Sequence, residues 1–172
     1  MAASLLDIAK KYHTDKAFFY APWYEKVLAG REIKRILEVG IGSLATMKDS
    51  ISRAGWTDYP TGASLLMWRD YFPNAEIHGL DNDPSTMFEA ERIETHLGFS
   101  DTWKSRRQFD LIIDDGDHDP QAQRDTRRNL YPLLRPNGLY VTEDIQDPDS
   151  WPYPVVRFEN EYGQAALSVY PG

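Results

Sequence analysis

Residues 35–42 read Arg-Ile-Leu-Glu-Val-Gly-Ile-Gly, and this stretch decides the fold class. A short apolar run that ends in two glycines is typical of a buried strand entering a tight turn. Three further runs of this kind occur at residues 76–81, 109–115 and 139–144, and each ends in one or two carboxylates. Because predicted helices alternate with these four predicted strands, we expect an α/β protein with a mostly parallel, doubly wound sheet and right-handed crossovers.

Helical spacing and capping residues predict helices between the strands. The predicted helices are two short ones within residues 3–29, one over 63–72, one that begins at Asp83-Pro84 and runs through Met87, Ala90 and Leu97, and one from Asp119-Pro120 to the terminating Pro136-Asn137-Gly138. Residues 146–154 are predicted to form a loop. Residues 155–159 and 165–169 are predicted to close the sheet as a C-terminal antiparallel hairpin.

The length of 172 residues fits a single domain over 1–172, with a helical N-terminal segment at 1–30 and a weakly periodic insertion at 43–61. Long loops inside compact domains are usually functional, so the insertion is a candidate lid. A formal net charge of −8 disfavours a nucleic-acid partner, and the absence of cysteine excludes disulfides, a thiolate nucleophile and zinc–thiolate sites.

The sequence predicts neither a membrane span nor a signal peptide. No apolar run is long enough to cross a bilayer, and Asp7 interrupts the apolar stretch that a signal peptide would need. We therefore expect a soluble, cytoplasmic protein without a membrane partner, and the sequence leaves a homo-oligomer open.

The glycine turn after residue 39 predicts a nucleoside site, because ligands of open parallel sheets bind outside the carboxyl ends of the strands. Gly40 and Gly42 would let the backbone approach a ligand, and Asp81 would accept two hydrogen bonds from a ribose diol. The alternative is that the glycines only form a turn and Asp81 only caps a helix. The spacing Gly40-x-Gly42-x-x-Ala45 also matches a loose dinucleotide fingerprint, but the acid follows almost twice as far on as the ~20 residues expected. A nucleoside without phosphates fits better.

Carboxylates at the ends of two other strands predict a metal site. Asp115, Glu143 and Asp144 can converge on one hard cation, most plausibly Mg²⁺ with waters. His118 follows on the same loop, where it can take a proton from a hydroxyl held on that cation. The alternatives are chance clustering of acids, helix capping by Asp114 or Asp144, and a surface histidine.

Two further features carry weaker hypotheses. Trp151 and Tyr153 are candidates for the wall of an acceptor pocket, although aromatic residues in such a loop more often cover the edge of a core. Several lysines of the N-terminal helices could attract an anion, but a solvated face is the favoured interpretation; they are Lys10, Lys11, Lys16 and Lys26.

An ordered set of stretches resembles the metal-dependent sugar O-methyltransferases of macrolide biosynthesis. The matching stretches are residues 11–16 (Lys-Tyr-His-Thr-Asp-Lys), 20–25, 37–42, 62–65, 67–73, 79–83, 109–118 and 143–145. That family uses S-adenosylmethionine on a Rossmann-like methyltransferase sheet. The resemblance therefore implies the same fold, a magnesium ion, and a small-molecule hydroxyl acceptor such as a sugar or glycosylated natural product.

The resemblance also implies roles for individual residues. Glu38, Gly40 and Asp81 would hold S-adenosylmethionine, and Tyr12 and Thr14 would close over its methionine end. Asp115, Glu143 and Asp144 would ligate magnesium, and His118 would be the general base. The remaining candidates for the cofactor site are Gly42, Ser100, Asp101 and Asp114.

Two other hypotheses remain at this point. A non-catalytic Rossmann-like binding module is suggested by the short chain and by the stretch Leu97-Gly98-Phe99-Ser100-Asp101, which keeps only the last two residues of the family's adenine motif. A dinucleotide-dependent oxidoreductase is suggested only by the spacing of Gly40, Gly42 and Ala45.

Overall fold

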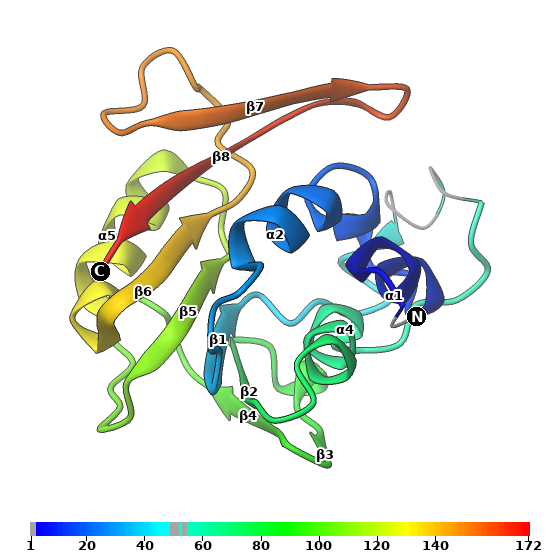
Figure 1. The fold of residues 1–172 in the computed structure, drawn as a ribbon, viewed down its shortest axis with the longest axis horizontal. Coiled ribbons are helices and arrows are strands. Elements are labelled where there is room, and N and C mark those ends of the chain that lie inside the picture. The colour runs from blue at the N-terminus through cyan, green and yellow to red at the C-terminus, as the bar shows by residue number, and fades with distance from the viewer. Residues whose placement is uncertain (1–2, 49–51, 53–54) are drawn as a thin grey trace.

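A computed structural model describes residues 3–48, 52 and 55–172. Over these residues, strands of one sheet follow the order β3-β4-β2-β1-β5-β6-β8-β7, and helices flank the sheet (Figure 1). The helices are α1 (Leu5–Lys11), α2 (Ala21–Leu28), α4 (Ala63–Tyr71) and α5 (Pro120–Leu130). The strands are β1 (Arg35–Val39), β2 (Glu76–Asp81), β3 (Glu89–Ala90), β4 (Ile93–Leu97), β5 (Phe109–Asp114), β6 (Leu134–Thr142), β7 (Val155–Asn160) and β8 (Gly163–Pro171). Short 3₁₀ turns occupy Asp15–Ala17, Pro84–Thr86 and Tyr131–Leu133.

The central strands are parallel, as predicted, and the last two are antiparallel. Strand β1 pairs in parallel with β2 on one side and β5 on the other, so that Val39 lies opposite both Leu80 and Asp114. Strand β6 continues the parallel sheet, and the hairpin of β7 and β8 closes it. Because the parallel strands are in register, their carboxyl ends meet at one edge, where the predicted site residues lie.

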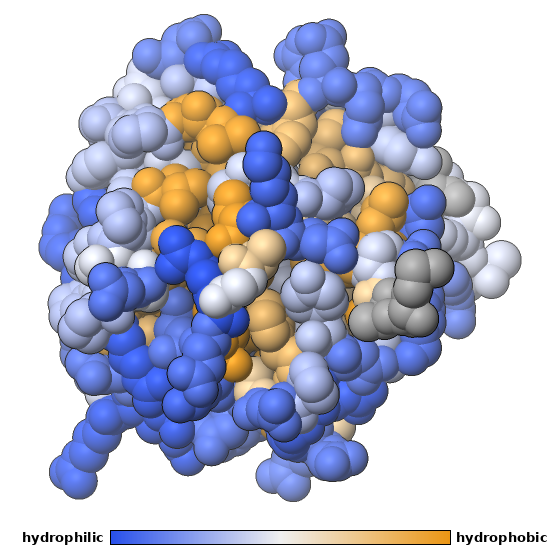
Figure 2. All heavy atoms as spheres, viewed as in Figure 1, coloured by the Kyte–Doolittle hydropathy of each residue, from blue (hydrophilic) through white to orange (hydrophobic). Residues whose placement is uncertain are grey.

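The two faces of the sheet pack against different helices. Ile36 and Ile77 belong to the apolar cluster that includes residues of α1, α2 and α4, whereas Leu37 and Ile112 pack with Leu130 of α5. Successive side chains of a strand point to opposite faces, which explains this division. On the face turned to the viewer, Figure 2 shows apolar side chains gathered around the β7–β8 hairpin within a hydrophilic surround.

The predicted helix over residues 83–97 is wrong. Asp83 does cap a turn, since its side chain accepts a hydrogen bond from the Ser85 N–H at 2.8 Å, but only a 3₁₀ turn follows. The chain then forms β3 and β4, and β4 buries Ile93 against Ile77 of β2. Burial of a β-branched strand in the sheet outweighs the local helix-start signal.

The boundary between α5 and β6 also differs from the prediction. The helix ends at Leu130, and β6 begins at Leu134, so that Pro136-Asn137-Gly138 lies inside a strand. The pairing of β5 with β6 shifts register between Phe109 and Leu111, and Asn137 has a φ of +66°. These turn residues therefore form a bulge in a strand and do not terminate a helix.

The other expected elements are confirmed, namely the two N-terminal helices, the helix over 63–72 and the C-terminal hairpin. Trp151 packs at a core edge with Ile145 and Ala166, and its indole N–H donates to the Tyr170 hydroxyl at 3.0 Å. No helix over the described residues is long and apolar enough to cross a membrane. Part of the candidate lid, residues 49–51 and 53–54, lies outside the described residues.

Candidate active site

A cleft of about 770 Å³ opens at the carboxyl edge of the parallel strands. Most of the predicted site residues line it, drawn from the ends of β1, β2, β4, β5 and β6. They are Gly40, Gly42, Asp81, Ser100, Asp101, Asp115, His118 and Asp144. The cleft thus places the glycine turn and the acidic strand ends in one cavity, as the sequence predicts.

The glycine end of the cleft depends on a close approach of two loops. Gly40 has a φ of +85°, and a Cβ placed there would lie 2.1 Å from the carbonyl oxygen of Asp115. Asp81 holds the turn, because its carboxylate accepts the Ile41 N–H at 2.8 Å and the Asp83 N–H at 2.9 Å. Each carboxylate oxygen has a further lone pair, so Asp81 can still accept hydrogen bonds from a ligand.

Two aromatic residues of the cleft have no role in the sequence-based site. Phe99 follows β4 with 65% of its surface exposed, and it offers a flat apolar wall beside Ser100 and Asp101. Tyr59 comes from the candidate lid segment and is buried against the cleft, close to Gly42. Phe99 could have been found from the sequence, because it lies in the stretch 97–101 that the sequence analysis compares with an adenine motif.

The acidic end of the cleft brings together Asp115, Asp144 and His118. One ligand atom from each of the three lies within 4.8 Å of the others. His118 Nε2 is 3.5 Å from Asp115 Oδ1 and 3.6 Å from Asp144 Oδ2. The hydrogen bond with Asp115, followed by the charge of the acids, raises the pKa of His118 to about 9. Two carboxylates beside open space fit Mg²⁺, which binds through one or two carboxylates and keeps several waters.

Glu143 lies beside this cluster but turns its carboxylate inward. Its two oxygens accept hydrogen bonds from the Tyr24 hydroxyl at 2.5 Å and from Lys16 Nζ at 2.8 Å, and only 1% of the residue is exposed. Asp115 and Glu143 are thus close enough to share a cation. In this structure the cation between them is the ammonium of Lys16, which is also 2.8 Å from Asp115 Oδ2.

The interpretation of Lys16 as part of a solvated face is therefore wrong, because the residue is 1% exposed. Burial by itself would lower the pKa of Lys16, but Asp115, Glu143 and Glu38 reverse this and keep the pKa well above its ordinary value. Lysine is almost never fully buried unless it is paired. The sequence offered only a weak signal that Lys16 belongs to the site, namely its position as the last residue of the matched stretch 11–16.

Glu38 and Asp114 lie beneath the cleft and do not line it. The Glu38 carboxylate accepts hydrogen bonds from the Ser64 hydroxyl and, at 2.5 Å, from the Trp68 indole N–H. Burial raises the pKa of Asp114 to about 8, and the Tyr140 hydroxyl lies 3.5 Å from its carboxylate. Through these contacts the two buried acids connect the ends of β1 and β5 to α4 and β6.

Tyr12 and Thr14 also lie outside the cleft lining. Thr14 caps the 3₁₀ turn that carries Lys16. The Tyr12 hydroxyl donates to Asp70 Oδ2 of α4 at 2.5 Å and lies 3.1 Å from Arg69, while Lys11 binds the same carboxylate at 2.9 Å. These contacts tie the N-terminal segment to α4.

Replacing Asp70 by asparagine is expected to lower the free energy of unfolding at neutral pH, because the variant loses a carboxylate whose pKa is lowered in the folded state. The loss should be only about 1 kcal/mol, because solvent screens this partly exposed carboxylate. Burial opposes the shift, but hydrogen bonds from Tyr12, Lys11 and Arg69 lower the pKa of Asp70 to about 2 from its ordinary value of 3.8. A lowered pKa stabilises the fold above that ordinary value, and the effect is lost as the pH falls toward 2. Urea denaturation should therefore show a gap between variant and wild type that narrows below pH 4, and a constant gap would contradict this account.

Comparisons with known proteins give one consistent picture. The chain is 33% identical over 150 residues to an 8-demethyl-8-(2-methoxy-alpha-L-rhamnosyl)-tetracenomycin-C 3'-O-methyltransferase of Streptomyces olivaceus, covering 80% of this chain and 36% of that protein. It is 32% identical over 153 residues to the mycinamicin VI 2''-O-methyltransferase of Micromonospora griseorubida, covering 82% and 36%. Among solved structures, the MycE methyltransferase of the mycinamycin pathway, in complex with Mg and SAH, matches with a TM-score of 0.69 and 28% identity over 88% of this chain and 39% of that one.

The fold is that of the Rossmann-like methyltransferases. No family model matches the chain. The chain spans about a third of the length of the curated relatives, at 36% of each.

Proposed function

We propose that this protein is an S-adenosylmethionine-dependent O-methyltransferase that acts on a hydroxyl of a small molecule, namely a sugar or glycosylated natural product, with Mg²⁺ at the acidic end of the cleft. One observation carries the proposal. A single cleft holds the glycine turn with Asp81 at one end and Asp115, Asp144 and His118 at the other. The similarity to a methyltransferase whose structure holds Mg and SAH supports a sulfur nucleoside and a cation as the ligands.

The residues of the cleft divide the chemistry between them. Gly40, Gly42 and Asp81 bind the nucleoside, Phe99 lies beside it, and Asp115 and Asp144 hold the cation. Bound Mg²⁺ supplies a Lewis acid that orients the acceptor hydroxyl and lowers its pKa. Mg²⁺ on Asp115 and Asp144 would offset the charge that keeps His118 protonated. His118 Nε2 would then take the hydroxyl proton while the acceptor oxygen forms a bond to the sulfonium methyl and the carbon–sulfur bond breaks. S-adenosylhomocysteine and the methyl ether are the products, and positioning supplies much of the rate.

Melting temperatures measured with S-adenosylmethionine, S-adenosylhomocysteine and NAD, each with and without Mg²⁺, test this proposal. A ligand at 100 times its Kd stabilises the folded state by about 2.7 kcal/mol. Each kcal/mol raises the melting temperature of a chain of this size by ~2–4 °C. We expect a rise of several degrees with the two sulfur nucleosides and none with NAD.

A rise with NAD alone would instead support the oxidoreductase hypothesis. No rise with any of the three compounds would support a binding module for some other ligand. Asp81→Asn is the matched variant, since it keeps the shape of the turn and removes the acceptor charge, and it should reduce the shift. The cytoplasmic location, the homo-oligomeric state and the single-domain organisation remain predictions from the sequence.

A further inference from the structure

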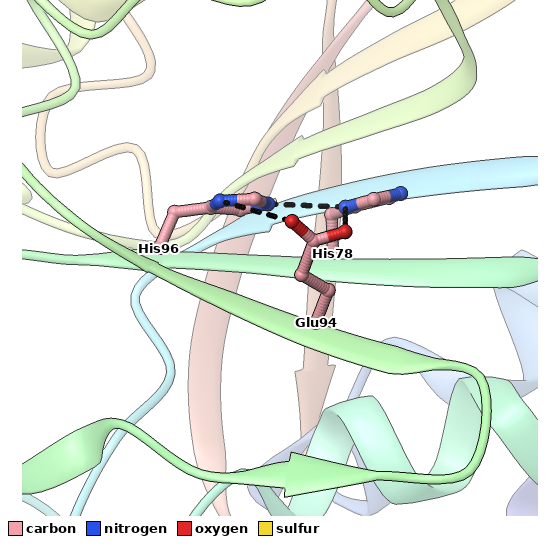
Figure 3. A group of neighbouring side chains, drawn as sticks. All are labelled: His78, Glu94 and His96. Carbon is pink, nitrogen blue, oxygen red and sulfur yellow. Dashed lines mark hydrogen bonds and ion pairs between the residues drawn. The ribbon is translucent and has the colours of Figure 1, made fainter.

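A second polar cluster lies on the sheet away from the cleft. It consists of His78 of β2 and of Glu94 and His96 of β4, which we call the His–Glu–His cluster (Figure 3). In the parallel pairing His78 lies opposite Glu94, so the three side chains share one face of the sheet. Trp103 contacts the ring of His96, and Phe109 contacts the ring of His78. None of the three residues lines the cleft at the carboxyl edge.

In the described residues 82–108 the chain forms a 3₁₀ turn, β3, β4 and a loop, where the sequence predicts an α-helix. A hollow of about 420 Å³, lined in part by His78 and Glu94, gives access to the His–Glu–His cluster. Even so, His78 is only 2% exposed. Two imidazoles and a carboxylate thus meet in a partly enclosed place that small ions can reach.

One ligand atom from each of the three residues lies within 4.8 Å of the other two, as in a group that could hold a metal ion. His78 Nδ1 is 3.1 Å from His96 Nε2 and 3.7 Å from Glu94 Oε2, and Figure 3 shows these groups turned toward one another. Zinc bonds of about 2.0–2.1 Å at tetrahedral angles place two ligand atoms roughly 3.3 Å apart. We propose that His78, Glu94 and His96 bind a divalent transition-metal ion of the zinc class, with water as the fourth ligand.

An unpaired nitrogen on the same ring supports this site independently. His78 Nε2 is buried and has no hydrogen-bond partner among the described residues. Such a group costs stability and calls for an explanation. A histidine that ligates a metal commonly donates its other ring N–H to a carboxylate. Glu76 Oε2 lies 3.8 Å from His78 Nε2 on an exposed side chain, where a small movement would supply that partner.

Two electrostatic features set the expected strength of the site. Burial, together with His96, lowers the pKa of His78 to about 4, so its imidazole is neutral at physiological pH, which is the form that ligates a metal. Against binding, Arg107 Nη2 lies 3.2 Å from Glu94 Oε2 and competes for that carboxylate. Arg107 is about half exposed and can swing into solvent, so we expect binding of moderate affinity.

A metal at this site would join β4 to its neighbour β2 near one side of the sheet. Strand β4 leads directly into Gly98–Asp101, which lines the main cleft. Binding would therefore stabilise the strand that presents these residues. The inference does not depend on methyltransferase activity, since it needs only the sheet and the three side chains.

Zinc titration of the full chain tests the proposal, in an Asp115→Asn background and with excess Mg²⁺, so that the acids of the cleft do not compete. We expect one equivalent of Zn²⁺ to bind and, at a hundredfold excess over Kd, to raise the melting temperature by roughly 5 °C or more. Zn²⁺ should also shift the ring-nitrogen NMR resonances of His78 and His96. Adding His96→Gln or Glu94→Gln should abolish or strongly weaken binding, whereas Glu91→Gln, an exposed neighbour, should not.

Three outcomes would overturn the proposal. These are a failure of the Asp115→Asn protein to bind Zn²⁺, equal binding with and without His96→Gln, and ring resonances of His78 and His96 that do not move. The NMR measurement can be made on the unsubstituted chain with excess Mg²⁺, so it decides the question even if a variant fails to fold.

Discussion

Replacing His118 by alanine is expected to lower turnover on a verified acceptor by ~10²–10⁴, the usual contribution of a positioned general base. His118 lines the cleft with Asp115 and Asp144 within 3.6 Å of its Nε2, and it is the imidazole that the described structure places in this cleft. Cofactor affinity should change little, because the glycine turn and Asp81 lie at the other end. The measurement is kcat with methyl transfer followed directly, together with the Kd of S-adenosylhomocysteine.

The matched control is His13→Ala, which removes an imidazole that does not line the cleft. Added imidazole should partly restore turnover to His118→Ala and leave His13→Ala unaffected. Full turnover by His118→Ala would remove the residue from the mechanism. A loss of turnover that parallels a loss of cofactor binding would point to a structural role instead.

Replacing Lys16 by methionine is expected to cost about 3–5 kcal/mol of unfolding free energy, which is the usual result of removing one partner of a buried ion pair. The Lys16 ammonium lies 2.8 Å from both Asp115 and Glu143 and 3.9 Å from Glu38. Its loss therefore leaves two buried acids and the partly buried Asp115 without their cation. Domains of this kind have only about 5–15 kcal/mol of stability in total. The variant should therefore unfold at much lower urea concentration than the wild type.

Lys10→Met is the matched control, since Lys10 is an exposed lysine of the same N-terminal segment and its replacement should change stability little. Adding Glu143→Gln to Lys16→Met should recover part of the loss, because it removes one of the unpaired charges. A loss of less than about 1 kcal/mol in the unfolding free energy of Lys16→Met would contradict this account. It would show that protonation or hydration stabilises the acids in place of the ammonium.

Local patterns in the sequence were sufficient for the central strands and for the edge of the sheet at which the site lies. The run 35–42 and its counterparts each combine a buried apolar stretch with a polar or glycine end, so the parallel register brings those ends together. The prediction failed where a local signal was weaker than burial in the sheet. Asp83-Pro84 starts only a 3₁₀ turn, and Pro136-Asn137-Gly138 forms a bulge inside β6.

The sequence by itself determined which strand ends carry the site, because the central apolar runs and their polar or glycine ends are patterns within each segment. Only the tertiary structure decided how each side chain is used, since that depends on contacts between segments far apart in the chain. Lys16 reaches Glu143, 127 positions later, and thereby turns that carboxylate inward, while Asp115, Asp144 and His118 face the cleft. His78 meets His96 only because β4 pairs beside β2. No local pattern of charge or hydropathy encodes such contacts, because a buried charge is stabilised by whichever partner the fold brings to it.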